Sequence, residues 1–273
     1  MTSVFKVKLI HLTPILASLL FGVVCTFLLL TSPIELYVIT PFSEDISGSL
    51  GNASYFVILV GAGAFLLYLL LKRKSRRLIT LITGFAITTV TFMLSLIYLL
   101  AAFSGFSSPY IEVFILTSSL LITILVDFTI FRVQSRIRNL IVLCLGGALG
   151  AFLGASIPTL SAILILCFLA VYDAFAVYHG PVGKIAFDGL EQLRGLSFSF
   201  KDIQMGLGDL TFYSMLSGHM LLKFGLISCA ASIISMLFGC FLSFKMLERK
   251  SMFPGLPFPI ILGLTASLLT SLQ

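Results

Sequence analysis

The sequence predicts an all-α membrane protein with nine transmembrane helices, a cytoplasmic N-terminus and a C-terminus outside. Two observations lead to this prediction: 59% of the 273 residues are hydrophobic and only 10% are charged, and the hydrophobic residues form long uncharged runs. About 20 apolar residues in a row can cross the hydrocarbon core of a bilayer as a helix. No hydrophilic stretch is long enough for a separate soluble domain, so we expect one polytopic membrane domain over residues 1–273.

Nine apolar runs are candidates for spans, and the fifth and ninth are short. They cover residues 9–31, 53–71, 78–102, 111–131, 139–156, 158–179, 205–222, 225–246 and 257–272. The first run is too long for a signal-peptide core and lacks a convincing cleavage site, so we expect it to be retained. The division between the seventh and eighth depends on Lys223 and Gly225. In the fifth, Gly146, Gly150 and Gly154 recur every four residues, which favours close helix packing over ligand binding.

The basic residues test this count, because cytoplasmic loops of membrane proteins are enriched in Lys and Arg. With the N-terminus inside, every one of the 17 basic residues except Lys223 falls in an inner segment. The inner set is Lys6, Lys8, Lys72, Arg73, Lys74, Arg76, Arg77, Arg132, Arg136, Arg138, Lys184, Arg194, Lys201, Lys245, Arg249 and Lys250. The first outer loop instead carries Glu35, Glu44 and Asp45. Membrane orientation therefore explains the net charge of +6, and we expect no nucleic-acid partner.

The connection between the sixth and seventh predicted spans, residues 179–204, is predicted to be a cytoplasmic loop. Residues 185–193 fit a short amphipathic helix on the membrane surface. After Gly195, apolar and polar residues alternate through Leu196, Ser197, Phe198, Ser199, Phe200 and Lys201. Strict alternation with two phenylalanines predicts a strand. A flexible linker with chance alternation is the alternative.

Two acidic residues lie inside predicted spans at similar depth. Asp173 precedes the inner end of its span by about six residues, roughly 9 Å, and Asp209 follows the inner start of its span by about four, roughly 6 Å. Charged groups in spans are costly and usually functional. Two close carboxylates share one proton, so one can take a proton from water while the other donates one to a carbonyl oxygen or a leaving amine. This is aspartic-protease chemistry, which needs neither a metal nor a cofactor.

The other polar candidates have simpler interpretations. Asp127 in the fourth span is interpreted as an inner-end residue that reaches the interface or pairs with a base. Tyr172 could wall the site or supply a hydrogen bond, but it points about 100° away from Asp173 around the helix, so a structural role fits equally well. The histidines and cysteines show no ligand spacing, which predicts neither a metal site nor a disulfide framework.

Three motifs stand at matching topological positions. They are Tyr172-Asp173 in the sixth span, Gly206-Leu207-Gly208-Asp209 opening the seventh, and Pro254-Gly255-Leu256-Pro257 opening the ninth. In this order they resemble the presenilin and signal-peptide-peptidase family of intramembrane aspartyl proteases, with its Tyr-Asp, Gly-X-Gly-Asp and Pro-Ala-Leu motifs. The resemblance covers essentially the whole chain. It implies that Asp173 and Asp209 are the catalytic dyad. The one departure is Gly255, where the family has alanine.

The resemblance also implies the setting of the reaction. The predicted orientation is that of the presenilin branch, and the compact sixth-to-seventh loop resembles an archaeal or other prokaryotic homologue in the cell membrane. The implied partners are transmembrane substrates and the lipid bilayer, accessory subunits are not evident, and a homo-oligomer stays open. Residues 254–257 would hold the dyad or bind substrate backbone. The strand at 196–200 could pair with a locally unwound substrate.

Two other functions compete with this prediction. An ion channel or proton-coupled transporter could use Asp173 and Asp209 as ion sites, because intramembrane acids are common there too. It predicts ion flux that depends on these acids and no peptide products. A prepilin-type peptidase shares the Gly-X-Gly-Asp motif, but nine spans and the motif at 254–257 argue against it.

Overall fold

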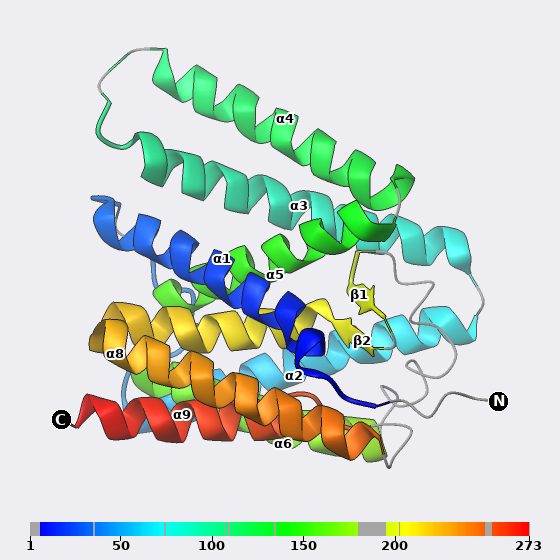
Figure 1. The fold of residues 1–273 in the computed structure, drawn as a ribbon. Coiled ribbons are helices and arrows are strands. Elements are labelled where there is room, and N and C mark those ends of the chain that lie inside the picture. The colour runs from blue at the N-terminus through cyan, green and yellow to red at the C-terminus, as the bar shows by residue number, and fades with distance from the viewer. Residues whose placement is uncertain are drawn as a thin grey trace.

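The protein is described here by a computed structural model that covers residues 6–34, 36–73, 75–106, 108, 110–133, 135–179, 195–201, 203–248 and 253–272. It is almost entirely helical, as predicted (Figure 1). The first part comprises the 3-10 helix η1 (Leu9–Leu12) and helices α1 (Thr13–Thr31), α2 (Ile46–Lys72), α3 (Arg76–Phe103), α4 (Ile111–Arg132), α5 (Ser135–Ser156) and α6 (Thr159–Tyr178). The second comprises strands β1 (Ser197–Phe200) and β2 (Ile203–Gly206) and helices α8 (Leu207–Leu247) and α9 (Pro257–Ser271).

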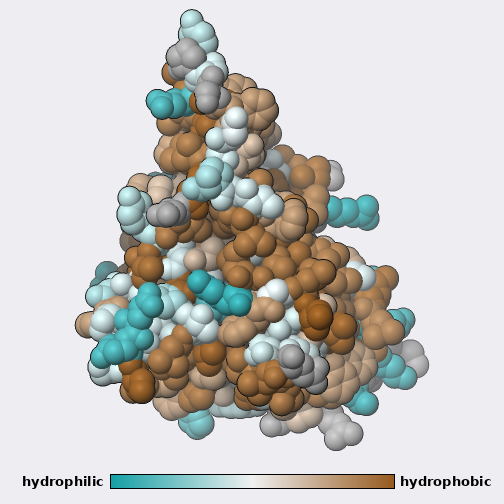
Figure 2. Space-filling view, turned by 90° about the vertical axis from the view of Figure 1, so that its left-hand side faces the viewer, coloured by the Kyte–Doolittle hydropathy of each residue, from teal (hydrophilic) through white to brown (hydrophobic). Residues whose placement is uncertain are grey.

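The described helices have the length and surface of membrane spans. By length and composition, α1 to α6 and α8 can cross a membrane, which makes 7 candidates among the described residues; α9 is shorter, with 15 residues. Large apolar side chains are exposed along the helices, for example Phe85 at 74% and Ile227 at 75%. Figure 2 views the helix ends on the left of Figure 1, and hydrophobic side chains cover most of that face. Apolar surface of this extent does not face water in a soluble monomer, so the chain is an integral membrane protein.

The second helix begins earlier than predicted, at Ile46 instead of residue 53. Asp45 caps it, because one carboxylate oxygen accepts a hydrogen bond from the backbone N–H of Gly48 at 3.0 Å. An N-cap aspartate satisfies a helix N–H that has no partner within the helix. The polar residues between Asp45 and residue 53 are therefore helical, although the prediction, which depended on apolar runs, did not include them.

The seventh and eighth predicted spans are the two halves of α8, which has 41 residues. A straight helix of this length would measure roughly 60 Å, about twice the hydrocarbon thickness. The backbone instead breaks at Gly225, with φ 86° and ψ −175°, a conformation that costs glycine little because it has no Cβ. In Figure 1 the first half runs away from the strands and the second half returns. The predicted division at this position is confirmed.

The first half of α8 packs against α5 along the glycine stripe. A Cβ added to Gly146 would lie 2.8 Å from Cβ of Leu210, and one added to Gly154 would lie 2.6 Å from the carbonyl oxygen of Met215. A Cβ on Gly150 would collide with the carbonyl oxygen of Thr211. The predicted packing role of these glycines is confirmed, and it fixes how close the start of α8 lies to α5.

The segment before α8 is an antiparallel hairpin with register Ser197↔Gly206 and Phe200↔Ile203. The strand predicted at residues 196–201 is confirmed in β1. The second strand was missed, and the seventh predicted span accordingly began at 205, two residues before α8. Lys201 turns the chain with φ 54°, while Phe198 and Ile203 are buried, so the hairpin has an apolar side of its own. The amphipathic helix predicted at 185–193 lies outside the described residues.

Helices α3 and α4 lie together at one edge of the bundle (Figure 1). Asp127 on α4 accepts a hydrogen bond from the hydroxyl of Thr88 on α3, at 2.7 Å. Its other carboxylate oxygen is buried and has no hydrogen-bond partner. Of the two interpretations of Asp127, pairing with a base is not seen among the described residues, since its hydrogen-bond partner there is a hydroxyl that joins two helices; a position at the interface stays a prediction.

Candidate active site

Asp209 lies in the first turn of α8, directly after β2. Gly206 ends β2 and is also the N-cap of α8, with an extended backbone at φ −75° and ψ 151°. The N–H of Leu207 donates to the carbonyl oxygen of Leu196 at 2.8 Å, which holds the hairpin to the helix start. The free N–H groups and the positive end of the helix dipole favour a carboxylate in this turn.

Asp173 approaches the same place from α6. Its Oδ2 accepts a hydrogen bond from the N–H of Leu256 at 2.9 Å, and its carboxylate interacts electrostatically with that of Asp209. The neighbouring Gly255 lies against Asp209: a Cβ added there would be 3.1 Å from Oδ2 and 3.3 Å from Cγ. Two consecutive residues of the predicted 254–257 motif therefore lie beside the two carboxylates, and both aspartates are half-buried.

The prolines of this motif shape the chain around the contact. Pro257 is at the first position of α9, where its missing N–H would have had no partner within the helix. Pro254 is buried. The chain between them is not helical, which leaves the Leu256 N–H free to bind Asp173. Irregular backbone at membrane depth is tolerated where it is buried or lines a wet cavity.

Tyr213 was missed in the sequence. It lies one helical turn after Asp209 in α8, is 1% exposed, and donates a hydrogen bond from its hydroxyl to the carbonyl oxygen of Gly255 at 2.7 Å. Its spacing of four residues from Asp209 places both side chains on one helix face. That spacing is the signal that could have identified it.

The other predicted support residues are Tyr172 and the two glycines of the motif before Asp209. Tyr172 lies next to α2, where a Cβ added to Gly61 would be 3.4 Å from its hydroxyl oxygen; its supporting role at the dyad stays a prediction. A Cβ on Gly206 would lie 3.9 Å from Asp209 Oδ2, and one on Gly208 would lie 3.8 Å from the ring of Phe212. These are ordinary contacts, so close packing does not explain the two glycines.

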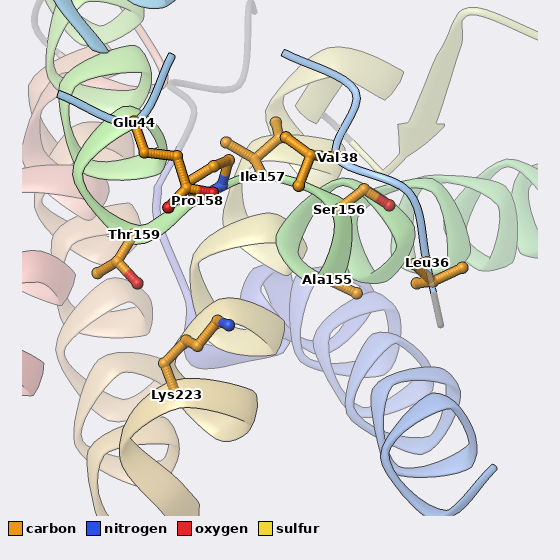
Figure 3. Close-up of a pocket in the computed structure, with 9 residues that line it drawn as sticks. All are labelled: Leu36, Val38, Glu44, Ala155, Ser156, Ile157, Pro158, Thr159 and Lys223. Carbon is orange, nitrogen blue, oxygen red and sulfur yellow. The ribbon is translucent and has the colours of Figure 1, made fainter. Parts of the chain in front are cut away.

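A cavity of about 230 Å³ lies far from the aspartates (Figure 3). Glu44, Thr159 and Lys223 are among its lining residues, and in Figure 3 the ammonium of Lys223 points into it. Lys223 and Asp209 lie on the same half of α8, about 14 residues or roughly 21 Å apart along the helix. The cavity is therefore separate from the paired carboxylates.

Two carboxylates beside one loop inside a bundle of apolar helices are compatible with a membrane-embedded aspartyl protease and with a transporter, and the comparison with protein families distinguishes these classes. A family model described as "Signal-peptide peptidase, presenilin aspartyl protease" matches residues 17–182, which is more than half of the chain. The chain therefore belongs to the signal-peptide peptidase and presenilin family, whose members are aspartyl proteases. The match includes Asp173 and ends before Asp209, so the second half of the site depends on the geometry above.

Solved structures show the same fold. The chain is similar to a presenilin family intramembrane aspartate protease solved in space group C222, with a TM-score of 0.69 and 18% identity over 97% of this chain and 99% of that chain. For a structure of a presenilin family intramembrane aspartate protease in space group P2, the TM-score is 0.67 and the identity 19%, over 96% and 97%. A comparison with curated protein sequences finds no match.

Proposed function

We propose that this protein hydrolyses peptide bonds within transmembrane segments of other membrane proteins, with Asp173 and Asp209 as the acid–base pair. One observation supports this most directly: the N–H of Leu256 binds Asp173, and the adjacent Gly255 lies beside Asp209, where an added Cβ would be 3.1 Å from Oδ2. A transporter site would need the acids to exchange ions along a path. Here one loop lies beside both acids, at the start of α8.

The reaction needs one proton shared by the pair. Two close carboxylates do not both ionise at low cost, so one stays protonated. The ionised carboxylate takes a proton from a water molecule, whose oxygen forms a bond to the carbonyl carbon of the substrate. The protonated carboxyl donates to the carbonyl oxygen, and a proton then passes to the amine as the C–N bond breaks. The N–H of Leu256 donates to Oδ2 of Asp173, and the backbone of Gly255 also hydrogen-bonds this carboxylate, so the loop orients Asp173 towards water and substrate.

The register of the hairpin indicates which strand receives an unwound substrate. The bond from Leu207 N–H to the Leu196 carbonyl makes the pairs 198/205 and 200/203 hydrogen-bonded, so the backbone groups of Ser199 and Gln204 point away from the partner strand. On β1 the outward carbonyl of Ser199 accepts a hydrogen bond from the Asn139 side chain. On β2 the outward groups belong to Gln204, which is exposed. We therefore assign strand addition to β2, with residues 196–200 supporting it.

Proline substitutions test whether the substrate pairs with the outer edge of β2 or with that of β1. Gln204→Pro removes the outward N–H of β2 without removing a bond to β1, and proline is tolerated at such edge positions. We expect Gln204→Pro to reduce cleavage at least several-fold more than the matched variant Ser199→Pro, which removes the outward N–H of β1. A larger loss of cleavage in Ser199→Pro would assign substrate pairing to β1. If both variants cleave the substrate as fast as the wild type, strand addition is rejected.

The proposed topology counts both halves of α8 and includes α9, which gives nine spans with a cytoplasmic N-terminus and an outer C-terminus. Residues 179–204 then form a cytoplasmic loop in a single membrane domain, in the cell membrane of a prokaryote, without a need for accessory subunits. The test is labelling of Lys223→Cys in intact cells with a membrane-impermeant maleimide, against Lys72→Cys. Labelling of position 223 alone supports the orientation, and labelling of position 72 alone reverses it.

Catalysis is tested with purified protein and a synthetic transmembrane peptide, with products read by mass spectrometry. We expect cleavage by the wild type and none by Asp173→Asn or Asp209→Ala. Asp127→Asn serves as the control, because it removes an intramembrane charge outside the pair. Full cleavage by Asp209→Ala contradicts the proposal. Ion flux that depends on Asp173, with an intact peptide, would identify a channel or transporter instead.

A further inference from the structure

One peptide group connects α8 to Asp173. The carbonyl oxygen of Gly255 accepts a hydrogen bond from the Tyr213 hydroxyl at 2.7 Å, and the N–H of Leu256 donates to Asp173 Oδ2 at 2.9 Å. These two groups belong to the same amide unit, which is planar and rigid. A hydroxyl bound to the carbonyl therefore fixes the direction of the N–H, and it also polarises the N–H as a donor.

The position of Tyr213 makes this connection specific. Tyr213 and Asp209 lie one turn apart on the same face of α8, so one helix carries one proposed catalytic carboxylate and contacts the peptide group that binds the other. The Tyr213 side chain is buried, and its hydroxyl also interacts with Cys240 on the second half of α8. Its environment therefore holds the hydroxyl in one place.

The loop itself gives the peptide group little rigidity. Gly255 has no side chain to pack, and glycine has more backbone freedom than any other residue. Gly255 nevertheless lies so close to Asp209 that an added Cβ would be 3.1 Å from Oδ2, so a rotation of the 255–256 peptide changes the surroundings of both carboxylates. A fixed hydrogen bond to the Gly255 carbonyl prevents this rotation.

We propose that Tyr213 is a positioning residue, whose hydroxyl orients the Gly255–Leu256 peptide group and through it sets the position and hydrogen bonding of Asp173. The inference rests on the proposed catalytic role of Asp173. Tyr213 itself does not touch the reacting atoms. If Tyr213 had only a structural role, removal of its hydroxyl would lower the stability of the fold but would leave the position and hydrogen bonding of the Asp173 carboxyl unchanged.

The protein contains a matched control. Tyr98 on α3 donates its hydroxyl to the carbonyl oxygen of Ala148 at 2.6 Å and also interacts with a cysteine, Cys25. Its contacts join α3 and α5 and do not include the 253–256 loop. Tyr98→Phe and Tyr213→Phe each remove one hydroxyl from a tyrosine that bonds a helix or loop carbonyl, so a general loss of stability affects both.

The experiment compares infrared spectra, kinetics and melting temperature of the full-length wild type, Tyr213→Phe and Tyr98→Phe in detergent. The carboxyl band of Asp173 is identified as the band lost in Asp173→Asn. We expect Tyr213→Phe to shift this band and to lower kcat roughly tenfold to a hundredfold, with KM little changed, because small displacements of a reacting group cost this much. Tyr98→Phe should leave both the band and kcat unchanged.

An unshifted Asp173 band in Tyr213→Phe, or equal losses of kcat in both variants, overturns the proposal. If Tyr213→Phe does not fold, 3-fluorotyrosine at position 213 retains the hydroxyl as a stronger donor, and the band should then move; a stationary band again overturns it. The readouts separate this inference from the function on which it rests. A wild type that cleaves no peptide while the band still shifts contradicts the protease function and supports the positioning role.

Discussion

Substitution of Gly150 by alanine tests whether the packing of α5 against α8 sets the position of Asp209. The added methyl group would collide with the carbonyl oxygen of Thr211 and would lie 2.5 Å from Cβ of Ser214 and 2.7 Å from the backbone N of Met215. Two of these three atoms are backbone, so a change of side-chain rotamer does not relieve the contact. The helices must separate.

The size of the effect follows from these distances. Ordinary contact for a Cβ begins at 3.4 Å, so the 2.5 Å approach to Ser214 alone requires a local movement of about 0.9 Å, and the closer Thr211 carbonyl oxygen requires slightly more. Overpacking of this kind costs about 1–3 kcal/mol of stability. Asp209 lies half a turn before Thr211 on the displaced helix, and a misplacement of about 1 Å can lower a rate about 100-fold. We therefore expect a large loss of kcat with a modest loss of stability.

The assay measures kcat on a synthetic transmembrane peptide and the melting temperature in detergent. Gly63→Ala is the matched control: Gly63 is an exposed glycine within α2, and an added Cβ there meets nothing within 4 Å. It should retain wild-type kcat, and alanine should stabilise the helix by about 0.5–1 kcal/mol relative to glycine. Unchanged kcat and melting temperature in Gly150→Ala would refute the argument that this contact positions Asp209.

Three smaller perturbations follow from other contacts. Gly255→Ala introduces the residue of the family motif with a Cβ 3.1 Å from the nearer carboxylate, a distance relieved by a few tenths of an ångström, so kcat should stay within about tenfold of the wild type. Hydrogen bonds from Ser43, a second serine and a backbone N–H lower the pKa of Asp45 to about 2. A carboxyl group whose pKa is lower in the folded state than in the unfolded state stabilises the fold fully at pH values above the unfolded-state pKa. This stabilisation is lost as the pH falls through the folded-state pKa. The difference in melting temperature between wild type and Asp45→Asn should therefore be full above about pH 4 and shrink towards pH 2. Asp127→Asn keeps an acceptor for the Thr88 hydroxyl and should retain kcat, whereas Asp127→Leu should lower the melting temperature.

The sequence was sufficient for those features that depend on composition and on position along a helix. Apolar run length located the long helices, and Gly225 marked the break within α8 because glycine alone adopts its φ at little cost. The depths of Asp173 and Asp209 were estimated from helical rise, and the structure places them beside the consecutive residues Leu256 and Gly255. The four-residue spacing of the glycines likewise predicted a close helix contact. Each of these is a local pattern with a regular geometric consequence.

Other features depend on contacts between segments distant in the chain. Strand β2 contains only Ile203–Gly206 and leads without a break into an apolar helix, so its alternation is too short to recognise. Its existence depends on pairing with β1, since a strand is stable only where its backbone groups have partners. The early start of α2 depends on one hydrogen bond to Asp45. For Asp127 the sequence suggested the interface or a base, because charge can be read from a sequence, whereas the Thr88 hydroxyl can be identified as its partner only once α3 and α4 are placed.

Tyr213 shows how these two kinds of information combine in the site. Its position in α8 is a matter of spacing, but its partner is a carbonyl 42 residues away, and a carbonyl group gives no signal in a sequence. The glycine stripe of α5 sets the position of α8, and α8 in turn carries Asp209 and reaches Asp173 through the Gly255–Leu256 peptide. The geometry of the pair therefore depends on the placement of one helix. It follows that mutations which move α8 as a body should impair both carboxylates together, whereas removal of the Tyr213 hydroxyl should affect Asp173 first.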